Sequence, residues 1–307
     1  ALLAVLLRWC WMSTADDAML QECLQLAQEV AREAGRMIRE AHERRADESV
    51  KIESKGSLAP GNMSVDLVTE TDKACEDYII GTLKKRFPSH AFIGEESSFA
   101  GPNGGPAGPL ELTEAPTWII DPLDGTTNYV HGYPLVTVSI ALAVGRELVL
   151  GVIHNPLLDQ MCSAVRGGGT MFNGKRVRVA GAKKVTDALV VNNVGASRDP
   201  AVNVTNTDRL LALLHANVRG LRNSGSAAQN MMDVACGRLD AYFEDGFGGP
   251  WDVAAGAVIV REAGGVCRHH LGGPFVLMAG KGHVLCGTAE LVDDIARVLN
   301  TVQPRAS

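Results

Sequence analysis

Apolar residues recur every three or four positions over residues 19–42, a spacing that predicts an amphipathic helix. A second helix is expected over 73–87, because Thr71-Asp72 is a favourable N-cap and Pro88 would end the helix. Helical spacing returns late in the chain and predicts further helices over 207–217, 226–236, 251–263 and 289–302.

Short apolar runs bounded by Gly, Pro, Asn or charged residues predict strands. Residues 134–179 hold several such runs separated by tight turns, among them Asn173-Gly174, and predict an antiparallel meander. The segments 44–64 and 101–109 are charged or rich in Gly, Ser and Pro, so we expect loops there. Other strands are expected over 65–69, 91–97, 116–121, 188–194, 219–222, 239–244, 265–269 and 283–286.

These elements predict two sheet-centred halves that pack as one compact unit. Residues 19–185 would form a mainly antiparallel half, and residues 186–307 a half with a more mixed sheet. Helices would cover both sheets. A chain of 307 residues can bury a substantial core in this way.

Charge and cysteine content narrow the class of protein. The formal net charge of −6, with no cluster of Lys or Arg, argues against a nucleic-acid partner. The cysteines are scattered without a C-x-x-C pair, which fits free thiols in a reducing, cytoplasmic environment better than a disulfide framework. They stand at positions 10, 23, 75, 162, 236, 267 and 286.

The beginning of the chain is apolar. Residues 1–11, ALLAVLLRWCW, are too few to span a bilayer, so we expect no membrane association. A targeting segment is the alternative interpretation, although no clear cleavage site follows. We expect residues 1–18 to be disordered.

Acidic residues stand where predicted strands end. Glu95 follows the run AFIG, Asp121 follows TWII, and Asp124 comes one turn later. Two like charges about 4 Å apart repel by about 4 kcal/mol at an effective dielectric constant near 20. If these strand ends are neighbours, the acids must share protons or bind cations, and an all-oxygen ligand set favours Mg²⁺ over zinc.

The residues after Asp124 are Gly125-Thr126-Thr127, a glycine turn that would open a helix and present N–H groups to an anion. Carboxylates for a metal beside N–H groups for an anion indicate a phosphate held between them. An alternative interpretation of D-x-x-D-G-T is a structural turn with an Asx cap. The later motif PWDVAAG, in which Asp252 heads a helix, favours the site over the turn.

Several segments, in this order, resemble the inositol monophosphatase family, and the similarity runs from about residue 19 to 299. The segments are VDLVTETD (65–72), FIGEES (92–97), WIIDPLDGTTNYVHGYP (118–134), GSAA (225–228), DAYFE (240–244) and GPWDVAAGAVIVREAGG (249–265). VTETD, SGS, VACGRLD and GFGGPWD look most like the plant-type subgroup, whose members also hydrolyse L-galactose 1-phosphate. The resemblance implies an α+β fold, a layered αβαβα sandwich, and a homodimer in the cytosol.

The resemblance also implies roles for individual residues. Two or three Mg²⁺ ions would be held by Glu95, Asp121, the carbonyl of Leu123, Asp124 and Asp252, and Li⁺ would inhibit. Glu95, Thr126 and Asp72 would position and deprotonate a metal-bound water. The phosphate would contact Asp124, Gly125 and Thr126. The substrate hydroxyls would contact Gly225, Ser226, Ala227 and Glu244.

Two segments depart from the family pattern. The loop KGSLAPGNMS (55–64) is longer than usual, and Lys55 is the best match to the family's loop lysine. The segment EDGFGGPWD is one residue longer than in animal-type members, which makes Asp245 a competitor for the role of Glu244.

The resemblance implies hydrolysis of myo-inositol monophosphate by a metal-activated water. L-Galactose 1-phosphate, or another small sugar or polyol monophosphate including histidinol phosphate, is the alternative substrate. A bisphosphatase or nucleotide 3′-phosphatase would need an extra basic cluster, which the sequence does not show. A catalytically silent scaffold of the same fold is the non-enzyme alternative. An assay of phosphate release with and without Mg²⁺ distinguishes the enzyme from the scaffold.

Other motifs give weaker signals. The spacing D-x-x-D differs from the D-x-D of enzymes that form an aspartyl-phosphate, and AGKG (279–282) lacks the spacing of a P-loop. GGG (167–169) predicts a turn rather than a phosphate cradle. His269-His270 is expected at an exposed strand end, on the surface and not as a metal ligand.

Overall fold

The computed structural model describes residues 14–44, 52–54, 67–98, 110–194, 197, 199–278 and 282–304. Three sheets are present in this part of the chain. The largest has the order β3-β4-β5-β6-β7-β8-β9, the second has the order β11-β10-β12-β14-β13, and β1 (Ile52–Ser54) pairs with β2 (Leu67–Thr69).

The seven-stranded sheet comes from the first half of the chain. Only its first pair, β3 and β4, is parallel, and every remaining pair is antiparallel and consecutive in sequence. A helix connects β4 to β5, and short turns connect the strands from β5 to β9. This is the predicted meander. Its strands are β3 (Ala91–Gly94), β4 (Thr117–Asp124), β5 (Thr137–Val144), β6 (Glu147–Asn155), β7 (Gln160–Val165), β8 (Gly169–Phe172) and β9 (Lys175–Val177).

The five-stranded sheet comes from the second half. It is mixed, because β10 pairs in parallel with β11 and β12, whereas β14 runs antiparallel to β12 and β13. Its strands are β10 (Leu189–Asn192), β11 (Gly220–Asn223), β12 (Ala241–Phe247), β13 (Val266–Arg268) and β14 (Gly282–Gly287). The chain passes from one sheet to the other between Val177 and Leu189, around the short 3₁₀ helix η2 (Val185–Asp187), and the division near residue 185 stays a prediction.

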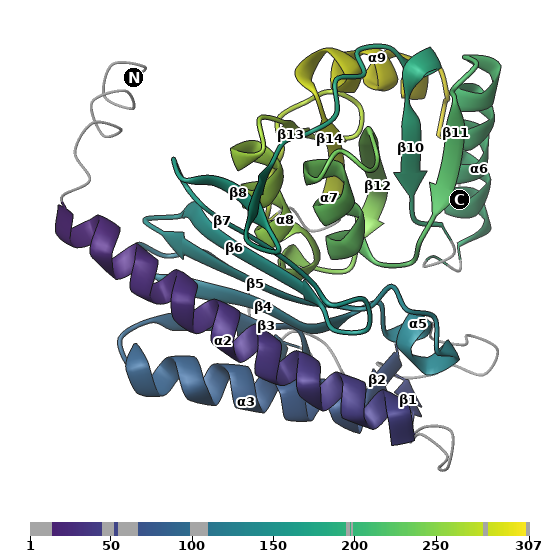
Figure 1. The fold of residues 1–307 in the computed structure, drawn as a ribbon. Coiled ribbons are helices and arrows are strands. Elements are labelled where there is room, and N and C mark those ends of the chain that lie inside the picture. Colours follow the sequence, from purple (N-terminus) through teal and green to yellow (C-terminus); the bar gives the residue numbers. More distant parts are fainter. Residues whose placement is uncertain are drawn as a thin grey trace.

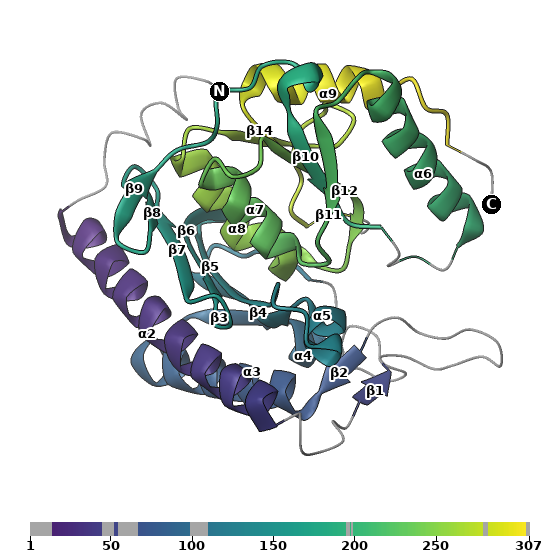
Figure 2. The same cartoon turned by 45° about the vertical axis from the view of Figure 1, so that its right-hand side comes forward.

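Helices and sheets alternate in layers (Figure 1). Helices α2 (Thr14–Arg44) and α3 (Glu70–Arg86) cover one face of the seven-stranded sheet. Helices α7 (Ala227–Ala235) and α8 (Pro250–Glu262) lie between the two sheets, and Figure 2 shows them there from a second angle. Helices α6 (Pro200–His215) and α9 (Ala289–Leu299) cover the outer face of the five-stranded sheet. The predicted layered αβαβα fold is confirmed.

Hydrophobic burial holds the layers together. One core lies between α2, α3 and the large sheet, around Trp118 and Ile140. A second surrounds α7 and α8 between the sheets and includes Met231 and Ile259. Each central helix therefore packs against a sheet on both sides, which explains the nearly continuous apolar sequence of α8.

Several boundaries differ from those expected. Helix α2 begins at Thr14 and thus includes residues 14–18, which we expected to be disordered; residues 1–13 lie outside the described part. Strand β1 lies within the segment 44–64 that we expected to be a loop. Helix α6 begins at Pro200, seven residues early, because Asp199 caps it by accepting a hydrogen bond from the N–H of Ala201 and proline suits the first turn.

The α8 backbone approaches strand β6 so closely that only glycine fits at position 151. A Cβ there would lie 2.4 Å from the carbonyl oxygen of Ala255. Gly151→Ala is therefore expected to destabilise the fold by about 1–3 kcal/mol, as overpacking does. Gly81→Ala is the matched control, because its Cβ would meet nothing within 4 Å and removing a helix glycine stabilises by about 0.5–1 kcal/mol. Urea unfolding midpoints measure both, and equal midpoints would contradict the packing argument.

Candidate active site

The parallel pairing of β3 and β4 brings two of the predicted acids together. The register aligns Gly94 with Ile120, so Glu95, which directly follows β3, and Asp121, the next residue of β4, are neighbours. Glu95 begins the short helix α4 (Glu95–Ser98) instead of continuing the strand as expected. The carboxylate of Glu76 on α3 accepts hydrogen bonds from the N–H groups of Glu96 and Ser97, at 2.8 and 2.7 Å, and fixes this turn.

Asp124 lies in the same strand, three residues beyond Asp121. β4 continues through Pro122 to Asp124, with a shift of register against β5 between the two acids. The Asp124 carboxylate accepts hydrogen bonds from the hydroxyls of Thr137 and Ser226 and from the N–H groups of Ala227 and Ala228. It therefore also anchors the N-terminus of α7, a contact 102 to 104 residues away in sequence.

Asp252 reaches the same region from the central helix layer. It lies in the first turn of α8, and its Oδ2 accepts hydrogen bonds from the N–H groups of Gly248 and Gly249 at 2.6 and 3.2 Å. The Ser139 hydroxyl donates a hydrogen bond to the carbonyl of Trp251 at 3.1 Å. This bond attaches the start of α8 to β5, beside β4.

These acids act on one another electrostatically. The pKa of Asp121 is raised well above its usual value, first by burial and then by the charges of Glu95, Asp124 and Asp252. The pKa of Asp252 is raised well above its usual value, first by burial and then by the charges of Glu95, Asp124 and Glu244. Burial also raises the pKa of Asp124, against the lowering effect of its hydrogen bonds with Ser226 and Ala228. Four carboxylates thus share one region, as the sequence motifs predicted.

The turn after Asp124 has the geometry of a helix start. Gly125 has φ 92° at the N-cap of α5 (Thr126–His131), and a Cβ there would lie 2.8 Å from the carbonyl oxygen of Leu135. Within the described part of the chain, no side chain caps α5. The Thr126 hydroxyl donates to the carbonyl of Leu123 at 3.3 Å, which orients that carbonyl into the turn.

Asp72 lies in the first turn of α3 and is fully buried, inside the helix and not at its N-cap as expected. Its neighbour Thr71 is 3.1 Å, hydroxyl to hydroxyl, from Tyr129 of α5. The start of α3 is thereby joined to the helix that begins with Thr126.

The segment Gly225–Ala227 stands opposite the Gly125 turn. Asn128 of α5 donates hydrogen bonds to the carbonyls of Leu135 and Ser224, both at 2.8 Å, and so links the two turns. Ser226 is the N-cap of α7, and its hydroxyl both accepts from the N–H of Gln229 and donates to Asp124.

Glu244 is the last of four consecutive buried residues at the start of β12. Its carboxylate accepts hydrogen bonds from the Tyr242 hydroxyl and from Asn193 Nδ2, the latter at 3.1 Å. Burial raises the pKa of Glu244 to about 7, opposed by the Tyr242 hydrogen bond. Asn193 Oδ1 accepts in turn from the N–H of Gly225 at 3.0 Å, so one amide joins Glu244 to the Gly225 turn.

The structure separates Asp245 from Glu244. Successive strand residues point to opposite faces of a sheet. Asp245 forms an ion pair with Arg209, and its Oδ1 lies 2.8 Å from Nδ1 of His283. Burial works against ionisation of Asp245, but its contacts with His283 and Arg209 outweigh burial and hold its pKa below the usual value. Lys55 lies outside the described residues.

Sequence reasoning missed the residues that hold the site in place. Thr137, Asn193, Tyr242 and Glu76 each bind a backbone or side-chain group of a predicted site residue or of the turn beside it. Three of the four lie far in sequence from the residue that they bind, and the exception is Tyr242, which stands two residues before Glu244. No local motif marks them.

The donor set fits a hard cation. It consists of carboxylate oxygens and one turn carbonyl, with no thiol or imidazole among the predicted ligands, as Mg²⁺ prefers. The largest effects on the pKa of Asp121 all raise it, so no described residue supplies a positive charge that compensates this buried group. A bound cation would supply that charge.

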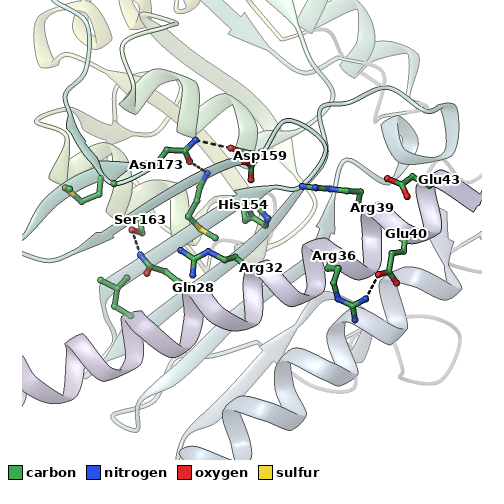
Figure 3. Close-up of a pocket in the computed structure, with 14 residues that line it drawn as sticks. Gln28, Arg32, Arg36, Arg39, Glu40, Glu43, His154, Asp159, Ser163 and Asn173 are labelled. Carbon is green, nitrogen blue, oxygen red and sulfur yellow. Dashed lines mark hydrogen bonds and ion pairs between the residues drawn. The ribbon is translucent and has the colours of Figure 1, made fainter.

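A cavity of about 940 Å³ lies apart from these residues, between α2 and strands β6 to β8 (Figure 3). Its lining includes Arg32, Arg36, Arg39 and His154 but none of the predicted site residues. Arg36 pairs with Glu33 and Glu40, and Arg39 donates to the carbonyl of Pro156.

The glycine run 167–169 is a turn, as predicted, because the Glu262 carboxylate accepts from the N–H groups of Gly167 and Gly169, both at 2.9 Å.

A layered αβαβα fold with buried acids at the strand ends defines a class of metal-dependent phosphatases. The sequence model of the inositol monophosphatase family matches residues 19–303, and the chain belongs to that family. It is 47% identical to inositol monophosphatase 2 of Solanum lycopersicum, covering 92% of this chain and 99% of that protein. It is 42% identical to inositol monophosphatase 2 of Homo sapiens, covering 92% of each. The solved structure of inositol monophosphatase from Anabaena superposes with a TM-score of 0.74 at 30% identity, covering 93% of this chain and 98% of that one.

Proposed function

We propose that this protein hydrolyses myo-inositol monophosphate to myo-inositol and phosphate. One observation carries the proposal: carboxylates from α4, β4 and α8 gather in one region, where burial and the neighbouring charges raise the pKa of Asp121 and Asp252. Groups so arranged are costly for folding and are typical of functional sites. The family to which the chain belongs, and the printed names of its relatives, supply the substrate class.

Mg²⁺ is the cation we propose for this site, with Glu95, Asp121, Asp124, Asp252 and the Leu123 carbonyl as ligands. When bound, Mg²⁺ would lower the pKa of a water and stabilise negative charge on the phosphate. The described residues provide the rest of the site. Thr126 and Asp72, with Glu95, would orient the attacking water and accept its proton. The backbone of Gly125 and Thr126 would hold the phosphate beside Asp124.

Substrate hydroxyls would meet the face formed by Gly225, Ser226, Ala227 and Glu244. The chain Glu244–Asn193–Gly225 fixes two of these residues relative to each other, which suits recognition of a rigid ring. L-Galactose 1-phosphate and histidinol phosphate present other arrangements of polar groups to the same face, and they remain the alternative substrates.

None of the described helices is both long and apolar enough to cross a membrane. A cytosolic homodimer stays a prediction.

Purified protein is expected to release phosphate from inositol 1-phosphate only when Mg²⁺ is present. Li⁺ is expected to inhibit at millimolar concentrations, because a small cation can enter a weakly bound metal site. A malachite green assay with and without a chelator measures this, and kcat/KM for inositol 1-phosphate, L-galactose 1-phosphate and histidinol phosphate ranks the substrates.

Two results would contradict this proposal. Phosphate release without any divalent cation would contradict a mechanism that depends on a bound metal. A thermal shift on Mg²⁺ addition without turnover of any of these phosphates would identify the catalytically silent scaffold instead.

A further inference from the structure

Three histidines meet at a place that the proposed reaction does not use. His269 and His270 follow β13, and His283 lies in β14. One ring nitrogen of each lies within 4.8 Å of the other two, and the ring centroids are 4.5 to 4.8 Å apart. The expectation that His269-His270 lies on the surface is wrong for His270, which is only 2% exposed.

His270 is buried, and neither of its ring nitrogens has a hydrogen-bond partner among the residues that the structure describes. Buried polar atoms are nearly always hydrogen-bonded, so an imidazole with two unpartnered nitrogens requires an explanation. Burial lowers the pKa of His270 to about 3, outweighing the raising effect of Asp245, and the charge of Arg209 lowers it further. The ring is therefore neutral near pH 7, and the neutral imidazole is the form that binds metals.

His283 has the neighbour that a metal-binding histidine commonly has. The Asp245 carboxylate lies 2.8 Å, Oδ1 to Nδ1, from its ring. The contact is too bent for a hydrogen bond, and Nδ1 of His283 has no hydrogen-bond partner among the described residues. A rotation of the ring that aligned Nδ1–H with the carboxylate would leave the lone pair of Nε2 available to a metal, as in carboxylate–histidine–metal arrangements. Asp245 is held in place by Arg209, whose side chain is only 3% exposed.

His269 is the adaptable member of the group. Its Nδ1 accepts a hydrogen bond from the N–H of Leu271 at 3.2 Å, so its Nε2 carries the proton in this conformation. Its ring is partly exposed. Binding a metal through Nε2 would require the other tautomer and loss of this long hydrogen bond, and binding through Nδ1 would displace Leu271 N–H directly.

We propose that His269, His270 and His283 form a second metal site, for a divalent transition metal such as Zn²⁺, separate from the carboxylate site. Nitrogen ligands suit zinc, copper and nickel, whereas Mg²⁺ prefers oxygen. With Zn–N bonds of about 2.0–2.1 Å, tetrahedral ligands stand about 3.3 Å apart, so the rings must close by up to about 1.5 Å. The partly exposed His269 and His283 can make this adjustment, and a water would complete the ligand set.

Cobalt is a suitable probe, because Co²⁺ replaces Zn²⁺ and absorbs visible light more strongly with a few nitrogen ligands than with octahedral oxygen ligands. The full-length protein in excess Mg²⁺, which occupies the carboxylate site, is titrated with Co²⁺ and then with Zn²⁺. We expect visible bands that saturate at a single equivalent and that Zn²⁺ abolishes. His269→Ala changes a partly exposed residue, keeps the fold and should weaken Co²⁺ binding at least tenfold, and His270→Ala should remove the bands.

Two controls separate this site from the carboxylate site. His215→Ala removes a histidine at the exposed end of α6 and should leave the titration unchanged. Asp121→Asn should leave the cobalt bands intact, and His269→Ala should leave Mg²⁺-dependent phosphate release intact. Unchanged bands in both histidine variants, or bands lost only with Asp121→Asn, would overturn the proposal without affecting the proposed phosphatase function.

Discussion

Asp121→Asn is expected to reduce phosphate release at least about a hundredfold while making the metal-free protein more stable. Loss of activity follows from removal of a proposed metal ligand, since even outer partners of metal sites change activity by about 10–100-fold. The stability gain follows because Asp121 is 1% exposed and is repelled by Glu95, Asp124 and Asp252. Removing one such charge should add on the order of 1 kcal/mol. Asn can still accept the hydrogen bond from the N–H of Leu123 through its amide oxygen.

Thermal unfolding in the presence of a chelator, together with the phosphate assay, measures both effects. Asp77→Asn, at an exposed position on α3, is the control and should change neither quantity. The combination matters, because a damaged fold would lower stability and activity together. Wild-type activity in Asp121→Asn would show that Asp121 is not a metal ligand. A metal-free variant less stable than the wild type would show that like-charge repulsion does not dominate the contribution of Asp121 to stability.

The variant Asp124→Asn would not separate an effect on activity from an effect on stability. Asp124 accepts hydrogen bonds from two backbone N–H groups at the start of α7 and from two hydroxyls. An amide nitrogen in place of one oxygen would face these donors, so Asp124→Asn should lower stability and activity alike. The same acid serves the site and the packing of a central helix, and its sequence motif shows only the first role.

Local patterns predicted the elements well because turns and apolar spacing are local properties. Asn173-Gly174 forms the expected hairpin turn, with φ values of 43° and 76°. The motifs placed acids at the ends of β3 and β4, but only the parallel register of those strands makes Glu95 and Asp121 neighbours. That register depends on the whole sheet.

Long-range contacts account for most of what the sequence did not predict. Asn193 contacts Glu244 from 51 residues away, and Glu76 fixes the turn after Glu95 from 20 residues away. His270 is buried because His283, 13 positions later, returns beside it on β14. A pair of histidines at a strand end carries no local signal of that burial.

Glu244→Gln is expected to lower kcat/KM for inositol 1-phosphate about ten- to a hundredfold and to leave glycerol 2-phosphate nearly unchanged. At an assay pH above its pKa of about 7, the Glu244 carboxylate is ionised. A buried hydrogen bond to a charged acceptor contributes about 1.5–3 kcal/mol, which corresponds to that range. Glu244 is 7% exposed and held by Tyr242 and Asn193, so its free oxygen can accept from ring hydroxyls with little loss of conformational freedom. A small acyclic phosphate offers no ring for it to recognise.

The comparison between the two substrates distinguishes recognition from catalysis. Glu244 lies close enough to Asp124 and Asp252 for their charges to act on one another. If its main effect were on the metal-binding acids, both substrates would lose rate equally, and the assignment to the substrate face would fail. If neither substrate lost rate, Glu244 would have no role in recognition. Asp245 could not simply replace it, because its carboxylate is already engaged by Arg209 and His283. A selective loss with the ring substrate is therefore the result that supports Glu244 as the specificity residue.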